Sequence, residues 1–356
     1  MKEEYLNLLK DLIQCRPVTS QVQCVNKVTH LLKEFLEKKG LYCNIENLGE
    51  RDVLYVSTRP GKVQDLLLNA HVDVVPAVCE EDYHPRVEGD RLYGRGANDC
   101  LGNVVTICQF LCEAGKSVSA AAFFSADEED GGFTTEGMVQ RGYSARKAVL
   151  VVDSGGYSTI GYAQKGIIVL KLKAKTHGGH ASVPWRFENP IERLIEGYCK
   201  LRAAWQNPTE ENPWSKSMTP CVITGGTVNN QIPDEAWMEV NIRYVADEEL
   251  NEIVKMAKDL SGLEVTVENS CPPVSADPEQ PAIKLLSKAF EKVDPSRSVQ
   301  LVRLCGATDA RYLKNLGVPV GIIGAVGGGI HGKGEYLEMP SVDILVEVMK
   351  HYASSL

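Results

Sequence analysis

The chain has 356 residues, 44% of them hydrophobic and 24% charged, with a formal net charge of −9 at pH 7. This composition is that of an ordinary soluble globular protein, and the acidic balance argues against a surface that binds nucleic acid or an anionic membrane. No apolar run in the sequence approaches the roughly 18 residues that a membrane span needs.

The cysteines indicate a reducing compartment. The chain has 11 of them, with no Cys-x-x-Cys pair, and most lie in apolar surroundings. The N-terminal stretch MKEEYLNLLKDLI is an acidic amphipathic helix without the features of a signal peptide. We therefore expect a cytoplasmic protein whose thiols stay reduced.

The first half of the chain combines helical and strand patterns. Apolar residues at helical spacing predict two amphipathic helices before Gly40. Strand and helix patterns then alternate in the order 65–70, 104–111, 120–126, a short helix near Met138, and 147–152. Residues 74–98 are predicted to be mostly loop. This alternation is typical of an α/β fold with a doubly wound, mainly parallel sheet.

The pattern changes near residue 165. Alternating apolar and polar residues at 167–173 indicate a half-exposed strand, and the elements that follow have the order βαββαβ of a ferredoxin-like sandwich. After a proline-rich stretch the α/β alternation returns. We expect a catalytic domain in two parts, residues 1–165 and 278–356, interrupted by an inserted α/β domain, residues 166–277.

Acidic and imidazole side chains follow the apolar strands. The candidates are His71 and Asp73 after the first strand, Glu128 and Glu129 after the second, Asp153 after the third, Asp99 in a glycine-bracketed loop, and His331 beyond a C-terminal strand. Ligands of open α/β sheets gather at the carboxyl ends of the strands, so these groups should converge. Imidazole and carboxylate together suit a borderline metal such as zinc.

The cluster is large enough for two metal ions, which need a shared carboxylate and separate ligands for each ion. We expect His71 and Asp153 on one ion, Glu129 and His331 on the other, and Asp99 between them. One of the two adjacent glutamates is then left to take a proton from a bound water as general base. Asp73 is placed to accept the second imidazole N–H of His71 and set its tautomer.

Each of these features alone has a simpler explanation. The acidic run at 127–130 could be a solvated loop, either histidine a hydrogen-bonded loop residue, and Asp99 the cap of the following helix. Their joint placement beyond successive predicted strands favours the metal site.

The motifs of the chain resemble a known family along nearly its whole length. They are HVD at 71–73, GRGANDCLG at 94–102, DEE at 127–129, HGGHASVP at 177–184, NQIPD at 230–234, NIR at 241–243, GATDAR at 306–311 and IHGKGE at 330–335. The chain is similar to the di-zinc metallopeptidases that include acetylornithine deacetylase, succinyl-diaminopimelate desuccinylase, aminoacylase and carboxypeptidase G. This resemblance implies two Zn²⁺ ions, with Co²⁺ or Mn²⁺ as substitutes, Glu128 as the general base and Glu129 on a metal.

The resemblance also assigns roles outside the metal cluster. It implies a cis peptide after Asp99, and it makes the inserted domain a lid that mediates homodimerisation. His180, otherwise a turn histidine, becomes the donor to the tetrahedral oxyanion, assisted by Asn230. Arg243, otherwise a surface strand residue, becomes a clamp for a substrate carboxylate. One departure is that Cys100 and Leu101 precede Gly102, where the family usually has a lysine before the glycine.

The resulting functional hypothesis is a zinc-dependent amidohydrolase that removes the acyl group of an N-acyl amino acid, as acetylornithine deacetylase and succinyl-diaminopimelate desuccinylase do. The alternative is a dipeptidase or carboxypeptidase of the same family. A metal-binding or peptide-binding protein without catalysis is a third class, against which the presence of Glu128 beside a full ligand set argues. The expected partner is a small N-acyl amino acid or short peptide.

Overall fold

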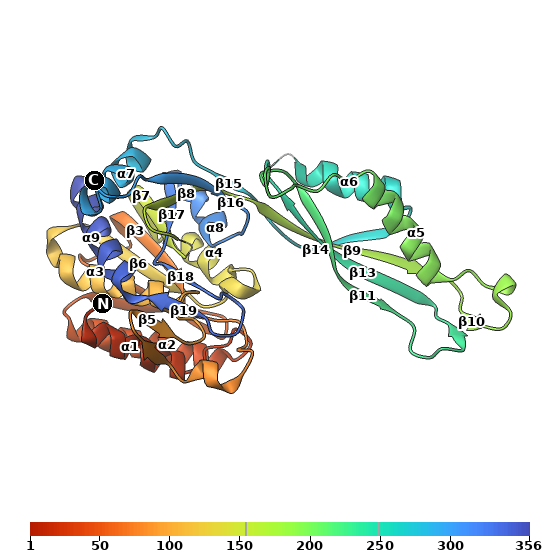
Figure 1. Cartoon of the computed structure of the whole chain (residues 1–356), viewed down its shortest axis with the longest axis horizontal. Helices are drawn as coiled ribbons and strands as arrows, with labels where there is room; N and C mark the ends of the chain where they lie inside the picture. Colours follow the sequence, from red (N-terminus) through yellow and green to blue (C-terminus); the bar gives the residue numbers. More distant parts are fainter. Residues whose placement is uncertain (154, 248) are drawn as a thin grey trace. The chain divides into compact units, whose positions relative to one another are not determined.

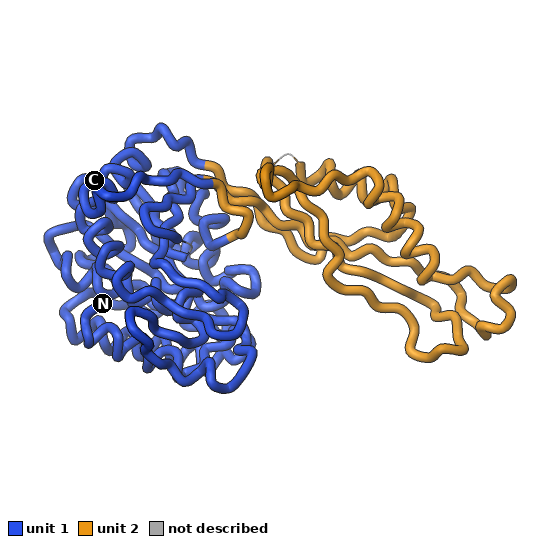
Figure 2. Tube along the Cα trace, viewed as in Figure 1, with its two compact units in different colours: residues 1–162, 276–302, 308–356 blue, residues 163–275, 303–307 orange. Residues whose placement is uncertain are grey.

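The computed structural model describes residues 1–153, 155–247 and 249–356, which fall into two compact units (Figure 2). The first unit comprises residues 1–162, 276–302 and 308–356, and the second comprises residues 163–275 and 303–307. The second unit thus consists of one long and one short segment that interrupt the sequence of the first.

A mixed sheet forms the centre of the first unit (Figure 1). Its strands there are β1 (Tyr42–Leu48), β2 (Arg51–Ser57), β6 (Ala120–Ser125), β3 (Val63–His71), β7 (Ser144–Val152), β17 (Val320–Ile323) and β8 (Thr159–Gln164), in spatial order. The four strands from β6 to β17 run parallel, while β2 and β8 run in the opposite direction on either side.

The helices of the first unit cover both faces of this sheet. They are α1 (Glu3–Gln14), α2 (Val22–Lys38), α3 (Leu101–Ala114), α4 (Phe133–Gln140), α7 (Pro281–Val293), α8 (Ala310–Leu313) and α9 (Met339–Ser355). In the sheet, β6 and β7 lie on either side of β3. The chain runs from β3 through α3 to β6, and then from β6 through α4, past β3, to β7. Crossovers between parallel strands are right-handed, so α3 and α4 lie on opposite faces. The predicted doubly wound α/β fold is confirmed.

Burial explains the apolar runs that predicted the central strands. Leu66–Leu68, Ala120–Phe124 and Val149–Val152 are fully buried, because helices cover both faces of the sheet at β3, β6 and β7. Because these strands run parallel, the polar residues that follow each of them lie at the same edge of the sheet.

Part of the predicted loop at 74–98 is regular. The short strands β4 (Arg86–Glu88) and β5 (Arg91–Tyr93) join β19 (Tyr336–Glu338) and β18 (Gly327–Gly328) in a separate antiparallel sheet. Most of residues 74–98 is loop, as predicted. The strands within it could not be predicted, because each has only three residues and β5 pairs with β19, far away in the sequence.

The second unit has a four-stranded antiparallel sheet in the order β11 (Ser217–Gly225), β13 (Glu235–Tyr244), β9 (Gly166–Lys175) and β14 (Glu264–Cys271). Helix α5 (Pro190–Ala203) packs on β9 and β13, and α6 (Glu249–Ser261) packs on β14. With the chain order βαββαβ, this is a ferredoxin-like α/β sandwich.

Alternate residues of this sheet form the core of the second unit. They are Ile168, Leu170, Leu172 and Ala174 on β9 and Ala236, Met238, Val240 and Ile242 on β13. Among the described residues no helix is both long and apolar enough to span a membrane.

Candidate metal centre

The expected metal-binding side chains of the first unit lie where the central strands end. His71 is the last residue of β3, Glu128 and Glu129 follow β6 in the short turn η3 (Glu128–Asp130), and Asp153 follows β7 directly. Asp99 immediately precedes Cys100, the N-cap residue of α3, and the Asp99–Cys100 peptide is cis. The cis peptide that the resemblance implied is therefore confirmed.

The two oxygens of Asp99 face two different histidines. Asp99 Oδ1 lies 3.0 Å from His71 Nε2, and Asp99 Oδ2 lies 3.2 Å from His331 Nε2. His71 Nε2 is also 3.5 Å from Asp153 Oδ1, and His331 Nε2 is 3.2 Å from Glu129 Oε1. The five side chains thus form two sets of donors that share Asp99, the same grouping that the sequence suggested.

The protonation of this cluster is governed by burial and by the paired charges. Burial raises the pKa of Asp99, but hydrogen bonds from His331 and His71 outweigh it and leave that pKa below its usual value. The hydrogen bond to Asp99 is also the main reason that the pKa of His331 rises to about 9. Burial raises the pKa of Glu129 to about 7. Imidazole and carboxylate side chains this close together form a donor set that suits divalent cations.

Glu128 has a different partner from Glu129. Its Oε1 accepts a hydrogen bond of 2.8 Å from Arg311 Nη2, which also donates to the backbone carbonyl of Glu128 at 3.1 Å. Burial raises the pKa of Glu128 well above its usual value, and the Arg311 charge opposes this effect. The two adjacent glutamates therefore have different side-chain partners, Arg311 for Glu128 and His331 for Glu129.

Asp73 makes contacts that differ in detail from those expected. His71 Nδ1 is hydrogen-bonded to the backbone carbonyl of Asp73 at 2.9 Å, whereas the nearer carboxylate oxygen is 3.4 Å away. The carboxylate instead accepts from Thr19 Oγ1 at 2.8 Å and from the backbone N–H groups of Glu128 and Glu129 at 3.1 and 3.3 Å. Asp73 thus links the orientation of His71 to that of the two glutamates.

Sequence reasoning missed two supporting ion pairs. Arg311 is buried beside Asp309, with Nη2 3.6 Å from Oδ1, and Asp309 Oδ2 accepts from Ser125 and Thr135. Arg95 and Glu335 form a buried pair at 2.7 Å. All four residues lie in motifs that carry the family resemblance, but the resemblance assigned them no role. Asp309 and Arg311 lie in GATDAR, Arg95 in GRGANDCLG and Glu335 in IHGKGE.

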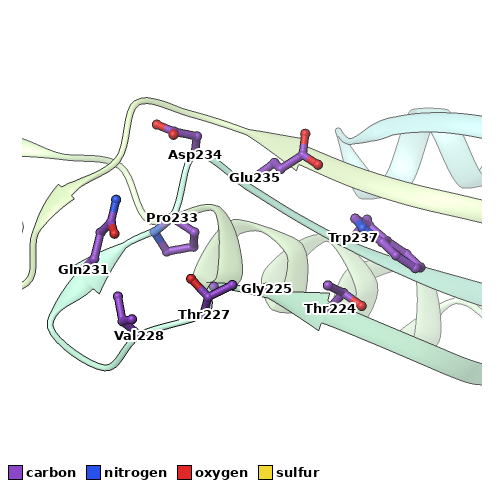
Figure 3. A pocket seen from close by; sticks show the side chains of 10 residues that line it. Thr224, Gly225, Thr227, Val228, Gln231, Pro233, Asp234, Glu235 and Trp237 are labelled. Atoms are coloured by element: carbon purple, nitrogen blue, oxygen red, sulfur yellow. The ribbon is translucent and has the colours of Figure 1, made fainter.

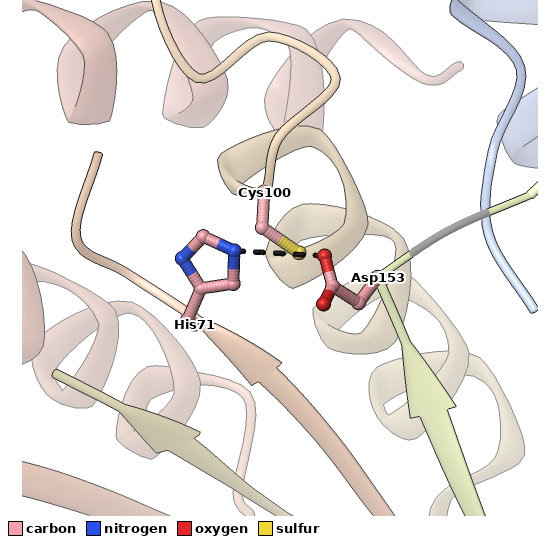
Figure 4. A group of neighbouring side chains, drawn as sticks. All are labelled: His71, Cys100 and Asp153. Carbon is pink, nitrogen blue, oxygen red and sulfur yellow. Dashed lines mark ion pairs between the residues drawn. The ribbon is translucent and has the colours of Figure 1, made fainter. Parts of the chain in front are cut away.

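Cys100 is a further side chain that the sequence did not assign. It is fully buried, and its Sγ donates to the backbone carbonyl of Val152 at 3.3 Å. Figure 4 shows the thiol beside His71 and Asp153, and the donor atoms of these three residues all lie within 4.8 Å of one another.

The three remaining candidates, His180, Asn230 and Arg243, belong to the second unit. His180 lies in β10 (Gly179–His180), which pairs with β12 (Gln231–Ile232), and the backbone carbonyl of Asn230 accepts from Ala181 at 3.0 Å. His180 and Asn230 are both exposed and lie close together. Arg243 lies on β13, half-buried, and its Nε donates to Asn241 at 3.1 Å.

A pocket of about 300 Å³ adjoins the β10–β12 pair within the second unit (Figure 3). Its lining includes Gln231, which pairs with His180, and also Asp234, Glu235 and Trp237. The lining has polar and aromatic groups but none of the clustered donors of the first unit.

Comparison with known proteins identifies the family of the chain. The sequence profile of Peptidase family M20/M25/M40 matches residues 67–355. Succinyl-diaminopimelate desuccinylase of Stenotrophomonas maltophilia is 25% identical over 340 residues, which cover 88% of this chain and 90% of that protein.

Two solved structures show the same fold. One is an M20 family metallo-carboxypeptidase from Sulfolobus solfataricus, with a TM-score of 0.82, 16% identity and 99% of both chains covered. The other is a dinuclear metal-binding peptidase of the M20 family from Bacillus subtilis, with a TM-score of 0.69, 14% identity and coverage of 99% of this chain and 97% of that chain. Because the family profile spans most of the sequence, the chain belongs to Peptidase family M20/M25/M40 and is a hydrolase of amide or peptide bonds.

Proposed function

We propose that the protein is a di-zinc amidohydrolase that removes the acyl group from an N-acyl amino acid. The observation that carries the proposal is the pair of donor sets that share Asp99, with Glu128 held separately by Arg311. The relative that is a desuccinylase supports the acyl substrate. The structural neighbours that are peptidases support the alternative, a dipeptidase or carboxypeptidase.

In this proposal His71, Asp153, Glu129, His331 and the shared Asp99 hold two metal ions. When bound, such ions polarise the scissile carbonyl and make a water more acidic. Glu128 takes the water proton at its carboxylate and later delivers it to the leaving amine, while Arg311 keeps that carboxylate in one orientation. The relative that binds a dinuclear centre supports the ion count.

The substrate class can be tested directly. Zinc-loaded protein is incubated with N-acetyl amino acids, N-succinyl amino acids and dipeptides, and release of the free amino group is measured. We expect turnover of one acyl class that a chelator abolishes and added zinc restores. Preference for dipeptides would favour the alternative, and a chelator-resistant or absent activity would contradict the metal-dependent hydrolase.

Arg311 is a positioning residue in this proposal. Replacing it by methionine removes the donor to Glu128 and leaves Asp309 without its nearby charge, so we expect kcat to fall about 10²-fold, the scale of a misplacement of about 1 Å. KM and metal content should change little, and added guanidinium should restore part of kcat. A variant that loses metal, or one that guanidinium leaves unaffected, would assign Arg311 a purely structural role.

His180 is proposed as the oxyanion donor because its tautomer suits that role. The backbone N–H of Ser182 donates to His180 Nδ1 at 3.1 Å, so Nδ1 is an acceptor and the neutral ring carries its proton on Nε2. An Nε2–H group can donate to an oxyanion, and loss of such a donor costs about 10²–10³ in kcat. Asn230 is proposed to assist, and Arg243 to bind a substrate carboxylate.

His180 belongs to the inserted unit, whereas the proposed metal ligands belong to the other unit. We propose a homodimer formed through the inserted domain, in which His180 serves either its own subunit or the partner. Mixing two inactive proteins, Glu128→Gln and His180→Ala, under conditions of subunit exchange separates these cases. Partial return of activity is expected if His180 acts on the partner subunit. No return despite proven exchange would assign it to its own subunit.

A further inference from the structure

The buried thiol of Cys100 lies beside one of the two donor sets. Cys100 has no exposed surface, and His71 has only 2%. In contrast, the side chain of His331, in the other donor set, is 53% exposed. The histidines of the two sets therefore differ in how far solvent reaches them, whereas Asp153 and Glu129 are each 10% exposed.

The backbone fixes the position of this thiol. Cys100 is the N-cap residue of α3, and its carbonyl accepts from Val104 at 3.0 Å. At Gly102 a Cβ atom would lie 2.1 Å from the backbone oxygen of Ala97, so this turn has no room for a side chain. Cys100 is thus held in place at the start of a long helix.

The thiol points toward a nitrogen and an oxygen donor (Figure 4). His71 Nε2 and Asp153 Oδ1 are 3.5 Å apart, and Cys100 Sγ completes a group whose atoms lie within 4.8 Å of one another. Three donors this close can surround a single ion. Its present partner, the carbonyl of Val152 at 3.3 Å, belongs to the residue that precedes Asp153.

We propose that Cys100 is a ligand of the metal ion held by His71 and Asp153, an inference that rests on the proposed di-metal function. On binding, the thiol releases its proton to solvent, the S–H···O contact with Val152 is lost, and the sulfur coordinates the ion, because a coordinating thiol is deprotonated. The buried position then has sulfur, nitrogen and oxygen ligands, and the more exposed position has only nitrogen and oxygen.

This asymmetry predicts different metal preferences. A thiolate favours Zn²⁺ or Co²⁺ over Mn²⁺, which prefers carboxylate, carbonyl and water ligands. Mn²⁺ should therefore replace the ion beside His331 and Glu129 more readily than the ion beside Cys100. Buried ligands that fill the coordination sphere also suit a structural ion, which leaves the exposed position open for substrate.

Absorption of the full chain loaded with Co²⁺ tests the proposal. We expect a thiolate-to-cobalt charge-transfer band in the near ultraviolet that grows with one of the two equivalents bound. Cys100→Ser should lose this band and keep the weaker visible bands of cobalt. The matched control is Cys108→Ser, since Cys108 is also fully buried in α3 but is absent from the donor group, and it should keep the band.

The possible results distinguish the role of Cys100 as a metal ligand from the proposed di-metal function. Two bound Co²⁺ ions without a charge-transfer band would overturn the role of Cys100 and leave the di-metal function intact, whereas failure to bind Co²⁺ or Zn²⁺ would overturn both. If Cys100→Ser does not fold, X-ray absorption of the wild-type zinc protein decides. A zinc–sulfur distance of about 2.3 Å is expected, and its absence would contradict the proposal.

Discussion

Replacing Glu128 by glutamine is expected to lower kcat by about 10²–10⁴-fold while both metal ions stay bound, since this is the usual contribution of a general base. The amide cannot take a proton from water. Its oxygen can still accept from Arg311 Nη2, as Glu128 Oε1 does at 2.8 Å, so the local structure should be kept. Steady-state kinetics together with metal analysis of the same preparation measure both quantities.

The neighbouring residue provides the matched control. Glu129 Oε1 lies 3.2 Å from His331 Nε2 within one donor set, so Glu129→Gln should lower the metal content itself. The two variants carry the same chemical change at adjacent positions. A fully metallated Glu128→Gln protein with near-normal kcat would refute the assignment of the base, and equal metal loss in both variants would refute the division of tasks.

Replacing Glu335 by alanine is expected to destabilise the metal-free protein by about 3–5 kcal/mol, the usual cost of leaving one partner of a buried ion pair alone. Glu335 pairs with Arg95 at 2.7 Å, and both side chains are 1% exposed. Its oxygens also accept from the backbone N–H groups of Gly96, Asn98 and Asp99, each at 2.9 Å. The substitution therefore leaves a buried cation and three buried donors without their acceptor.

The same substitution should weaken metal binding by about 10–100-fold, as the loss of groups that orient ligands commonly does. Glu335 holds the backbone of Asp99, and Arg95 Nη2 donates to the carbonyl of Gly332, next to His331, at 2.9 Å. The Arg95–Glu335 pair thus joins the loop that carries Asp99 to the loop that carries His331, and both of these residues are proposed metal ligands. Urea unfolding with a chelator present measures the stability, and a competition titration measures the metal affinity.

Two further variants test this explanation. Arg95→Met should cost less than Glu335→Ala, because Glu335 would keep its three backbone donors. Glu88→Ala should change little, because Glu88 pairs with Arg86 on the surface, where both side chains are about half exposed. If all three variants have the same stability, the buried network does not support the loops.

The amino-acid sequence alone determined the strands that carry the candidate site. Runs such as LLL at 66–68 and AAAFF at 120–124 are apolar because both faces of their strands are buried, and this pattern is local. Parallel strands of one sheet present their carboxyl ends at one edge. The polar residues that follow β3, β6 and β7 could therefore be grouped from their positions in the chain.

Only the tertiary structure decided what supports those residues. Arg311 and Glu128 are 183 positions apart, and Arg95 and Glu335 are 240 apart. The second pair meets because β5 and β19 adjoin in a sheet of strands too short to be predicted. The carboxylate of Asp73 likewise accepts hydrogen bonds from the backbone of two glutamates, while its nearer oxygen lies 3.4 Å from the imidazole two residues away. Side-chain contacts of this kind depend on how distant elements pack, and local periodicity carries no information about that packing.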